Sequence, residues 1–140
     1  MSDPGLSRLL LEAFRTLDAE IGVALRDRGV TDLRPSQALA LLNVDRTGTR
    51  LSEMAQRADV SKQAMMQLID ELAASGCVRR TPDPSDARAK VVRLTAKGVR
   101  HRGAARKAVA SVESRARRHL GSRRYDNLRA ILTELRTVEE

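Results

Sequence analysis

The sequence predicts a mainly α-helical protein of the α+β class, in which one small β-hairpin interrupts a series of helices. Three observations favour this fold class. Apolar residues recur at three-and-four spacing along most of the 140 residues, which is typical of amphipathic helices. Residues 51–75 fit two short helices joined by a tight turn. Residues 77–94 hold two β-type runs on either side of a turn that contains Pro, Asp and Ser.

The first helix is expected over about residues 5–28. Ser2, Asp3 and Pro4 are typical of a helix start, and Gly29 is typical of a helix end. The apolar stripe is wide enough to pack on more than one partner element. It consists of Leu6, Leu9, Leu10, Ala13, Phe14, Leu17, Ile21, Ala24 and Leu25.

A second helix is predicted over about residues 35–44, because Pro35 suits a first helical turn. Residues 45–49, with Gly48, are expected to form a turn. A short third helix then starts at Leu51, with Ser52 as its expected N-cap. Its inward-facing residues are predicted to be Met54, Ala55 and Ala58.

A fourth helix is predicted over about residues 61–75. Ser61 is a suitable N-cap, and Gly76 can adopt the left-handed conformation that ends many helices. Because about three residues join the third and fourth helices, the pair has the geometry of a helix-turn-helix motif. The face expected to be buried consists of Met65, Leu68, Ile69 and Leu72.

The hairpin is expected over about residues 77–94, and Thr95 should cap a fifth helix that extends to about residue 119. Gly121 and Ser122 separate it from a sixth helix. A hairpin directly after a helix-turn-helix predicts a wing, so residues 35–94 are expected to form a winged helix-turn-helix lobe. The apolar residues of the sixth helix are Tyr125, Leu128, Ile131, Leu132, Leu135 and Val138.

The composition indicates a polyanionic partner. The formal net charge is +8, from 26 Lys and Arg against 18 Asp and Glu, and a basic surface attracts nucleic acid. Only Phe14 and Tyr125 are aromatic, whereas proteins that read single-stranded RNA stack its bases on aromatic rings. Duplex DNA is bound through phosphates and groove edges and needs no such rings. We therefore expect double-stranded DNA as the partner.

The terminal helices, about residues 5–28 and 96–138, are predicted to form a homodimer. Both carry apolar stripes that the central lobe alone cannot bury, and a second copy would cover them. A two-fold dimer would address a palindromic DNA site. The expected interface residues are Leu6, Leu10, Leu128, Ile131, Leu132 and Leu135.

The chain resembles the MarR family of bacterial winged-helix regulators over almost its whole length, residues 1–140 as a single domain. The resemblance is carried by Ser61–Gln63, Leu72–Arg80, the wing Asp83–Arg88 and the following Leu94–Gly98. It implies a triangular homodimer that represses or, less often, activates nearby genes. It also implies relief of DNA binding by a small phenolic or lipophilic ligand or by oxidation. The family's ligand pocket would draw on the first, second and fifth helices, but the sequence assigns no ligand-binding residue.

Within the wing, the resemblance implies that Arg88 enters the minor groove and that Asp86 orients its guanidinium. A narrow minor groove concentrates negative potential, which favours Arg. The simpler alternative is an exposed Asp–Arg pair with no role in DNA binding. Arg80 and Lys90 flank Arg88 and would contact phosphates, or else they are solvated strand charges.

The exposed side of the fourth helix is the predicted recognition surface. Gln can bond the major-groove edge of adenine bidentately, and Met can contact a thymine methyl. A stripe of this kind is otherwise simply solvated, and capping is the main role expected of its first member. The family often has an Arg near the position of Gln67, so its base preference does not carry over. The surface consists of Ser61, Lys62, Gln63, Met66 and Gln67.

No catalytic site, metal site or cofactor is predicted. His101 and His119 have no ligands at metal-binding spacing around them, and no nucleophile, phosphate-loop or zinc-protease motif occurs. Cys77 is interpreted as a small buried residue rather than a redox sensor. Since neither a signal peptide nor an apolar run of membrane-spanning length is recognised, a cytoplasmic protein is expected.

Two other functions fit part of the sequence. A basic architectural or nucleoid protein would coat DNA without sequence preference, and the net charge alone fits it equally well. An RNA-associated helical protein would also be basic, although the scarcity of aromatic residues disfavours it. A discrete palindromic footprint on DNA would separate a sequence-specific repressor from both.

Overall fold

The computed structural model describes residues 2–137, which form six α-helices, one short 3-10 helix and a three-stranded antiparallel sheet. The helices are α1 (Leu6–Asp27), α2 (Pro35–Ala40), α3 (Leu51–Ala58), α4 (Lys62–Ala74), α5 (Ala96–Leu120) and α6 (Ser122–Leu135). The 3-10 helix η1 is Leu41–Asn43, and the strands are β1 (Thr49–Arg50), β2 (Val78–Asp83) and β3 (Asp86–Leu94). The predicted fold class is confirmed.

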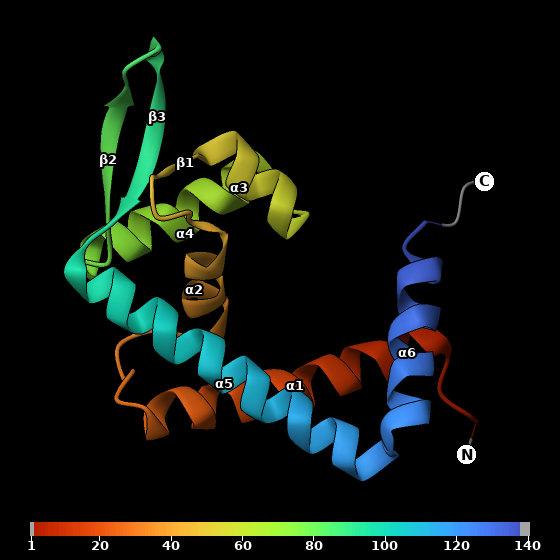
Figure 1. The fold of residues 1–140 in the computed structure, drawn as a ribbon. Coiled ribbons are helices and arrows are strands. Elements are labelled where there is room, and N and C mark those ends of the chain that lie inside the picture. The colour runs from red at the N-terminus through yellow and green to blue at the C-terminus, as the bar shows by residue number, and fades with distance from the viewer. Residues whose placement is uncertain (1, 138–140) are drawn as a thin grey trace.

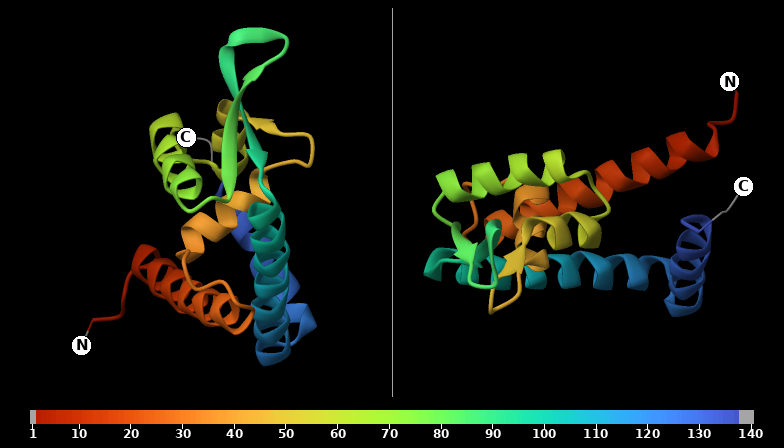
Figure 2. Two further views of the ribbon diagram at one scale, coloured as in Figure 1. Left: turned by 90° about the vertical axis from the view of Figure 1, so that its left-hand side faces the viewer. Right: turned by 90° about the horizontal axis from the view of Figure 1, so that it is seen from above.

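The molecule has a lobe with a projecting wing at one end and long helices leading away from it. The hairpin β2–β3 extends beyond the lobe formed by α2, α3 and α4 (Figure 1). Helix α5 runs from the base of the wing to the far end, where α6 stands across it. Helix α1 crosses α5 and diverges from it toward its own N-terminus (Figure 2). The start of α1 and the end of α6 therefore both lie away from the wing.

Two hydrophobic cores hold these parts together. The first joins α2, η1, α3, α4 and the hairpin, and its largest buried members are Leu41, Met54, Met65, Ile69 and Leu72. The second lies where α1, α2 and α5 meet, and it is built from Ala24, Leu25, Val30, Ala38, Ala105, Ala108 and Val112. Small alanine side chains let the helices approach closely, so the lobe is tied firmly to α1 and α5.

The predicted helix boundaries depend on local capping, and most of them are confirmed. The Ser61 Oγ accepts a hydrogen bond from the Ala64 backbone N–H at the start of α4. The Thr95 Oγ1 accepts one from the Gly98 N–H at the start of α5. Gly76 has a φ of +79° directly after α4, the left-handed conformation that glycine adopts without strain.

The predicted cap of α3 is wrong. The helix starts at Leu51 with Arg50 in the N-cap position, so Ser52 lies within its first turn and caps nothing. Residues 45–49 were expected to form only a turn, yet Thr49 and Arg50 form strand β1 and pair with β3. This pairing fixes the backbone just before α3 and sets where the helix begins.

Two other expectations differ from the structure in detail. Helix α2 is shorter than predicted, because its last turn tightens into η1. Ser2, Asp3 and Pro4 precede α1, whose N-cap is Gly5. Val138, predicted on the last helix, lies outside the described residues. No helix within residues 2–137 is long and apolar enough to cross a membrane.

Candidate nucleic-acid interface

Helix α4 presents a polar stripe to solvent. Met65, Ile69 and Leu72 are fully buried in the first core, which turns the opposite side of the helix outward. That side carries all the residues predicted to read DNA, and each is exposed: Ser61, Lys62, Gln63, Met66 and Gln67. Met66 has half of its surface exposed, at 50%. An uncharged stripe with one lysine at its start can contact base edges and a phosphate.

The wing carries cations on the side that faces α4. Val78 and Val92 point into the first core against α4. Side chains alternate along a strand, so Arg80 lies on the same face as Val78, and Lys90 lies on the same face as Val92. Lys90 is exposed. Arg80 also pairs with Asp70, which is exposed and lies one helical turn after Met66 and Gln67 on α4, so this wing cation lies beside the recognition surface.

Arg88 lies in a bulge of β3. Pro82 pairs with Lys90, and the next residue, Asp83, pairs with Asp86, so residues 87–89 have no partner on β2. A bulge redirects side chains out of the regular ladder, and Arg88 is exposed. Asp86 was expected to orient the Arg88 guanidinium. In the structure, its Oδ1 accepts the Arg88 backbone N–H at 3.0 Å and so shapes the bulge.

Two polar contacts that the sequence did not reveal anchor the wing. The Arg50 Nε donates to Asp83 Oδ2 at 2.7 Å, and Arg80 forms an ion pair with Asp70 on α4. The backbone N–H and hydroxyl of Ser85, then Arg50, lower the pKa of the Asp83 carboxyl to about 2, against the opposing effect of burial. Each contact joins residues of two different elements that meet only in the folded chain, so no local signal could have found them.

Helix α4 is also fixed at its C-terminal half. The Gln37 Nε2 and the Arg34 Nη2 both donate to Glu71 Oε2, at 2.7 and 2.8 Å. The Gln37 amide first, and then the Arg34 charge, hold the pKa of Glu71 below its ordinary value against the effect of burial. Gln37 itself is buried. This network sets the position of α4 on α2.

A third cluster links the end of α4 to α5 and to the loop before α2. The Lys97 Nζ donates to Asp32 Oδ2 at 2.6 Å and to the Ser75 carbonyl at 2.7 Å. The bond with Asp32 raises the pKa of Lys97, and the same bond lowers the pKa of Asp32. His101 lies 3.0 Å from the other oxygen of Asp32. Within the described residues, no group of three or more His, Cys, Asp or Glu could hold a metal ion.

Cys77 is fully buried in the first core, which agrees with its interpretation as a small packing residue. A side chain at Gly98 would collide with the Cys77 carbonyl. The hairpin and α5 therefore meet closely at this point, directly beneath the wing.

The terminal helices leave apolar side chains exposed. Leu6, Leu128, Ile131 and Leu135 are exposed, with Ile131 at 60%, whereas Leu10 and Leu132 are half-buried. Phe14, on the same helix as Leu6, has an exposed fraction of 62%. Apolar side chains clustered on one surface commonly mark a contact with another protein.

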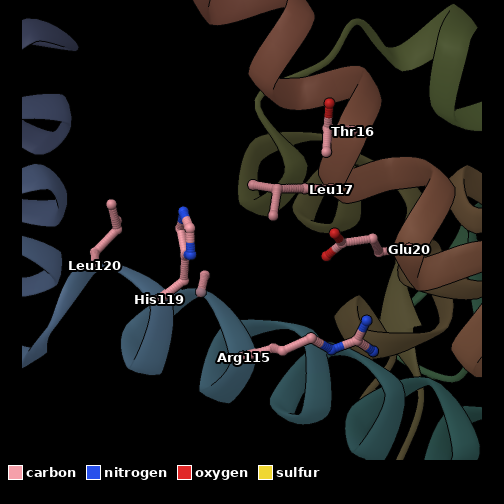
Figure 3. A pocket seen from close by; sticks show the side chains of 7 residues that line it. Thr16, Leu17, Glu20, Arg115, His119 and Leu120 are labelled. Carbon is pink, nitrogen blue, oxygen red and sulfur yellow. The ribbon is translucent and has the colours of Figure 1, made fainter.

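A hollow of about 460 Å³ opens between α1 and α5. In Figure 3, Leu17 and Glu20 extend into it from α1, and His119 and Leu120 from α5. Leu17, Ala116 and Leu120 make part of the lining apolar, and Thr16, Glu20, Arg115 and His119 supply polar groups. The size suits a small organic ligand. Helix α2, which was expected to contribute to such a pocket, lines no part of it.

Residues 31–89 match the sequence model of the MarR family. No protein of curated function matches the chain. CouR from Rhodococcus jostii, solved with bound p-coumaroyl-CoA, is similar in structure. It has 25% identity and a TM-score of 0.75 over 94% of this chain and 92% of CouR.

Two similar structures were solved with DNA. A mutant of E. coli MarR, complexed with operator DNA, has 21% identity and a TM-score of 0.81 over 93% of this chain and 92% of its own. The S. aureus MepR–DNA complex has 18% identity and a TM-score of 0.83 over 95% of this chain and 96% of its own. At these identities the likeness concerns the fold, which is shared along nearly the whole length.

Proposed function

We propose that this chain is a member of the MarR family of winged helix-turn-helix transcription regulators, whose sequence model matches residues 31–89, and that it is a homodimer that binds a palindromic operator and represses nearby genes. Members of the family regulate transcription and are not enzymes, so the proposal assigns this chain no catalytic activity. The proposal treats residues 1–140 as one domain. Residues 35–94 bind DNA, and residues 5–28 and 96–138 form the dimer.

One observation carries the proposal: Arg80 of the wing pairs with Asp70, which lies one helical turn after Met66 and Gln67 on the exposed side of α4. Gln63, Met66 and Gln67 read base edges in the major groove, where an α-helix fits. Lys62 contacts a phosphate. Arg88, which leaves the β3 ladder at its bulge, enters the adjacent minor groove. Helix α4 is thus the recognition helix of this proposal.

Dimerisation follows from the exposed apolar residues at the far end of the molecule. Leu6, Leu10, Leu128, Ile131, Leu132 and Leu135 form the interface. Burying a large aliphatic side chain contributes about 1.5–3 kcal/mol, so this set can supply much of the free energy of association. The two-fold symmetry of the dimer makes the operator palindromic, with half-site centres about 34–36 Å apart.

Selection of duplexes from a randomised pool, followed by footprinting, tests the proposal. We expect one discrete palindromic footprint and an affinity that falls steeply with salt concentration, since phosphate contacts release counterions. Uniform protection of every fragment would instead show a sequence-independent architectural protein. Tighter binding of duplex RNA than of duplex DNA in competition would show an RNA-binding protein.

A small phenolic or lipophilic effector relieves repression in this proposal, and the hollow between α1 and α5 is its site. The hollow joins an apolar wall with Glu20, Arg115 and His119, which can bond a hydroxyl or a carboxylate. CouR was solved with p-coumaroyl-CoA, so p-coumaroyl-CoA and free p-coumarate are suitable first probes. Release of the selected duplex by either probe, and loss of that release in Leu17→Trp, would support the site. Release unchanged in Leu17→Trp would contradict it.

A further inference from the structure

A polar brace spans the bulged part of the wing. The strand order is β1-β3-β2, so β1 and β2 lie on the two sides of β3. Arg50 on β1 pairs through its backbone with Val91 of β3. Its side chain nevertheless reaches Asp83 at the end of β2. The bulged segment, residues 87–89, lies between Asp86, which pairs with Asp83, and Val91, which pairs with Arg50. The Arg50 side chain therefore spans this segment.

Asp83 fixes the wing turn with both of its carboxylate oxygens. Oδ2 accepts from the Arg50 guanidinium, and Oδ1 accepts from the Ser85 N–H at 2.9 Å and from the Ser85 hydroxyl at 2.8 Å. The Arg50 Nη2 also donates to the Ser85 Oγ at 3.3 Å. Asp83 is only 9% exposed. Burying a carboxylate is costly unless it is paired and hydrogen-bonded, and here each oxygen has such a partner.

Arg88 lies within the bulged segment that this arrangement spans. It has no partner on β2, so the ladder itself does not hold it. The bulge is closed at one end by the Asp83–Asp86 pair and at the other by the Pro82–Lys90 pair, directly before Val91, with which Arg50 pairs. A segment that is ordered before binding loses less conformational entropy when it meets its ligand.

We propose that Arg50 and Asp83 are positioning residues for DNA binding, which hold the bulge of β3 so that Arg88 is presented to the minor groove. This inference rests on the proposed function. It assigns no DNA contact to either residue: both act through Arg88.

The test is a double-mutant cycle on the duplex that the wild-type protein selects from a randomised pool. Asp83→Asn and Arg50→Gln both break the brace, yet they change the net charge in opposite directions. We expect both to weaken binding by about three- to tenfold, since ordering the freed segment then opposes binding. Asp27→Asn at the end of α1 and Arg106→Gln on α5, both at exposed positions outside the predicted interface residues and away from the wing, make the same charge changes and serve as controls. Binding is measured well below the Tm of each variant.

The coupling to Arg88 separates positioning from a general loss of structure. We expect the double variant Asp83→Asn/Arg88→Ala to bind as weakly as Arg88→Ala alone, because the brace has no other route to the DNA. Additive losses in the double variant would overturn the proposal. So would opposite effects of Asp83→Asn and Arg50→Gln that match the two controls.

The proposed function and the brace fail in different ways. If Arg88→Ala binds as tightly as the wild type, the wing contact of the proposed function is wrong and the brace is wrong with it. If Arg88→Ala weakens binding while Asp83→Asn and Arg50→Gln do not, the wing contact stands and only the brace is wrong. Faster amide hydrogen exchange at residues 84–90 in Asp83→Asn, with unchanged exchange in α4, is the expected structural signature.

Discussion

Arg80 on strand β2 forms an ion pair with Asp70 on helix α4. The pair joins the two elements that the proposed function places on DNA. The pair also places the Asp70 carboxylate beside the expected phosphate backbone. It occupies the Arg80 guanidinium, which is predicted to contact a phosphate. Both side chains are partly exposed, at 39% and 59%, so the pair can open when DNA arrives.

Asp70→Asn is expected to strengthen DNA binding. The substitution removes a negative charge near the phosphates and frees Arg80 to contact them. An exposed charge interaction is worth about 0.2–1 kcal/mol, so the gain should reach at most about fivefold in Kd. Fluorescence anisotropy at fixed salt concentration measures it, with Asp27→Asn, at an exposed position on α1, as the charge-matched control. Weaker binding by Asp70→Asn would mean that the ion pair is needed to place the wing.

Substitutions along α4 should separate base reading from phosphate contact. Gln63→Ala and Gln67→Ala should each cost about 1–3 kcal/mol on the selected duplex and relax the preference at one position of each half-site. Lys62→Ala should weaken binding to all sequences and lower the salt dependence by about one phosphate contact. Repeating the selection with each variant measures both effects. A glutamine variant that keeps the full wild-type preference would remove that residue from the recognition surface.

Ile131→Asp is expected to break the dimer. Ile131 is 60% exposed on α6, and burial in an interface would contribute about 1.5–3 kcal/mol at each of two symmetric copies. Aspartate loses that contribution, so the dimer dissociation constant should rise by more than about a hundredfold. Sedimentation equilibrium measures it. Ile131→Val keeps the apolar contact and should remain dimeric. A dimer of Ile131→Asp at the same concentrations would place the interface elsewhere.

The free energy of unfolding should depend on pH in the acid range, because Asp83 titrates there. Its folded-state pKa is about 2, below the usual value of 3.8, so the ionised carboxylate stabilises the fold. That contribution is complete above about pH 4 and is lost as the pH falls toward 2. In urea unfolding, the wild type should exceed Asp83→Asn in stability at pH 6, and this difference should shrink between pH 4 and 2. Ser85→Ala removes a hydroxyl that donates to the Asp83 carboxylate, so the folded-state pKa of Asp83 should move back toward 3.8. The stabilisation by ionised Asp83 should then be smaller and should be lost over a narrower pH range.

The helices could be predicted from the sequence because their signals are local. Ser61 and Thr95 each bond a backbone N–H three residues further on, and a cap of that kind is visible in the residue order alone. The outward side of α4 followed from the spacing of Met65, Ile69 and Leu72.

The remaining features depend on residues that meet only in the folded chain. Strand β1 has two residues, too few for a periodic pattern, and it exists because β3 lies beside it. The same pairing displaced the predicted cap at Ser52. The Arg50–Asp83 contact and the Gln37–Glu71 contact each join residues more than 30 positions apart. Their geometry is fixed by tertiary packing, which the residue order does not display.

The burial of Cys77 gives the protein an internal reporter. It is the single cysteine of the chain, and it sits without solvent exposure between the end of α4 and the start of the hairpin. A thiol reagent can modify it only when this junction opens, so the labelling rate gives the free energy of that opening. Operator DNA that contacts both α4 and the β2–β3 hairpin should disfavour this opening and so slow the labelling of Cys77. The measurement needs no fluorophore or added tag.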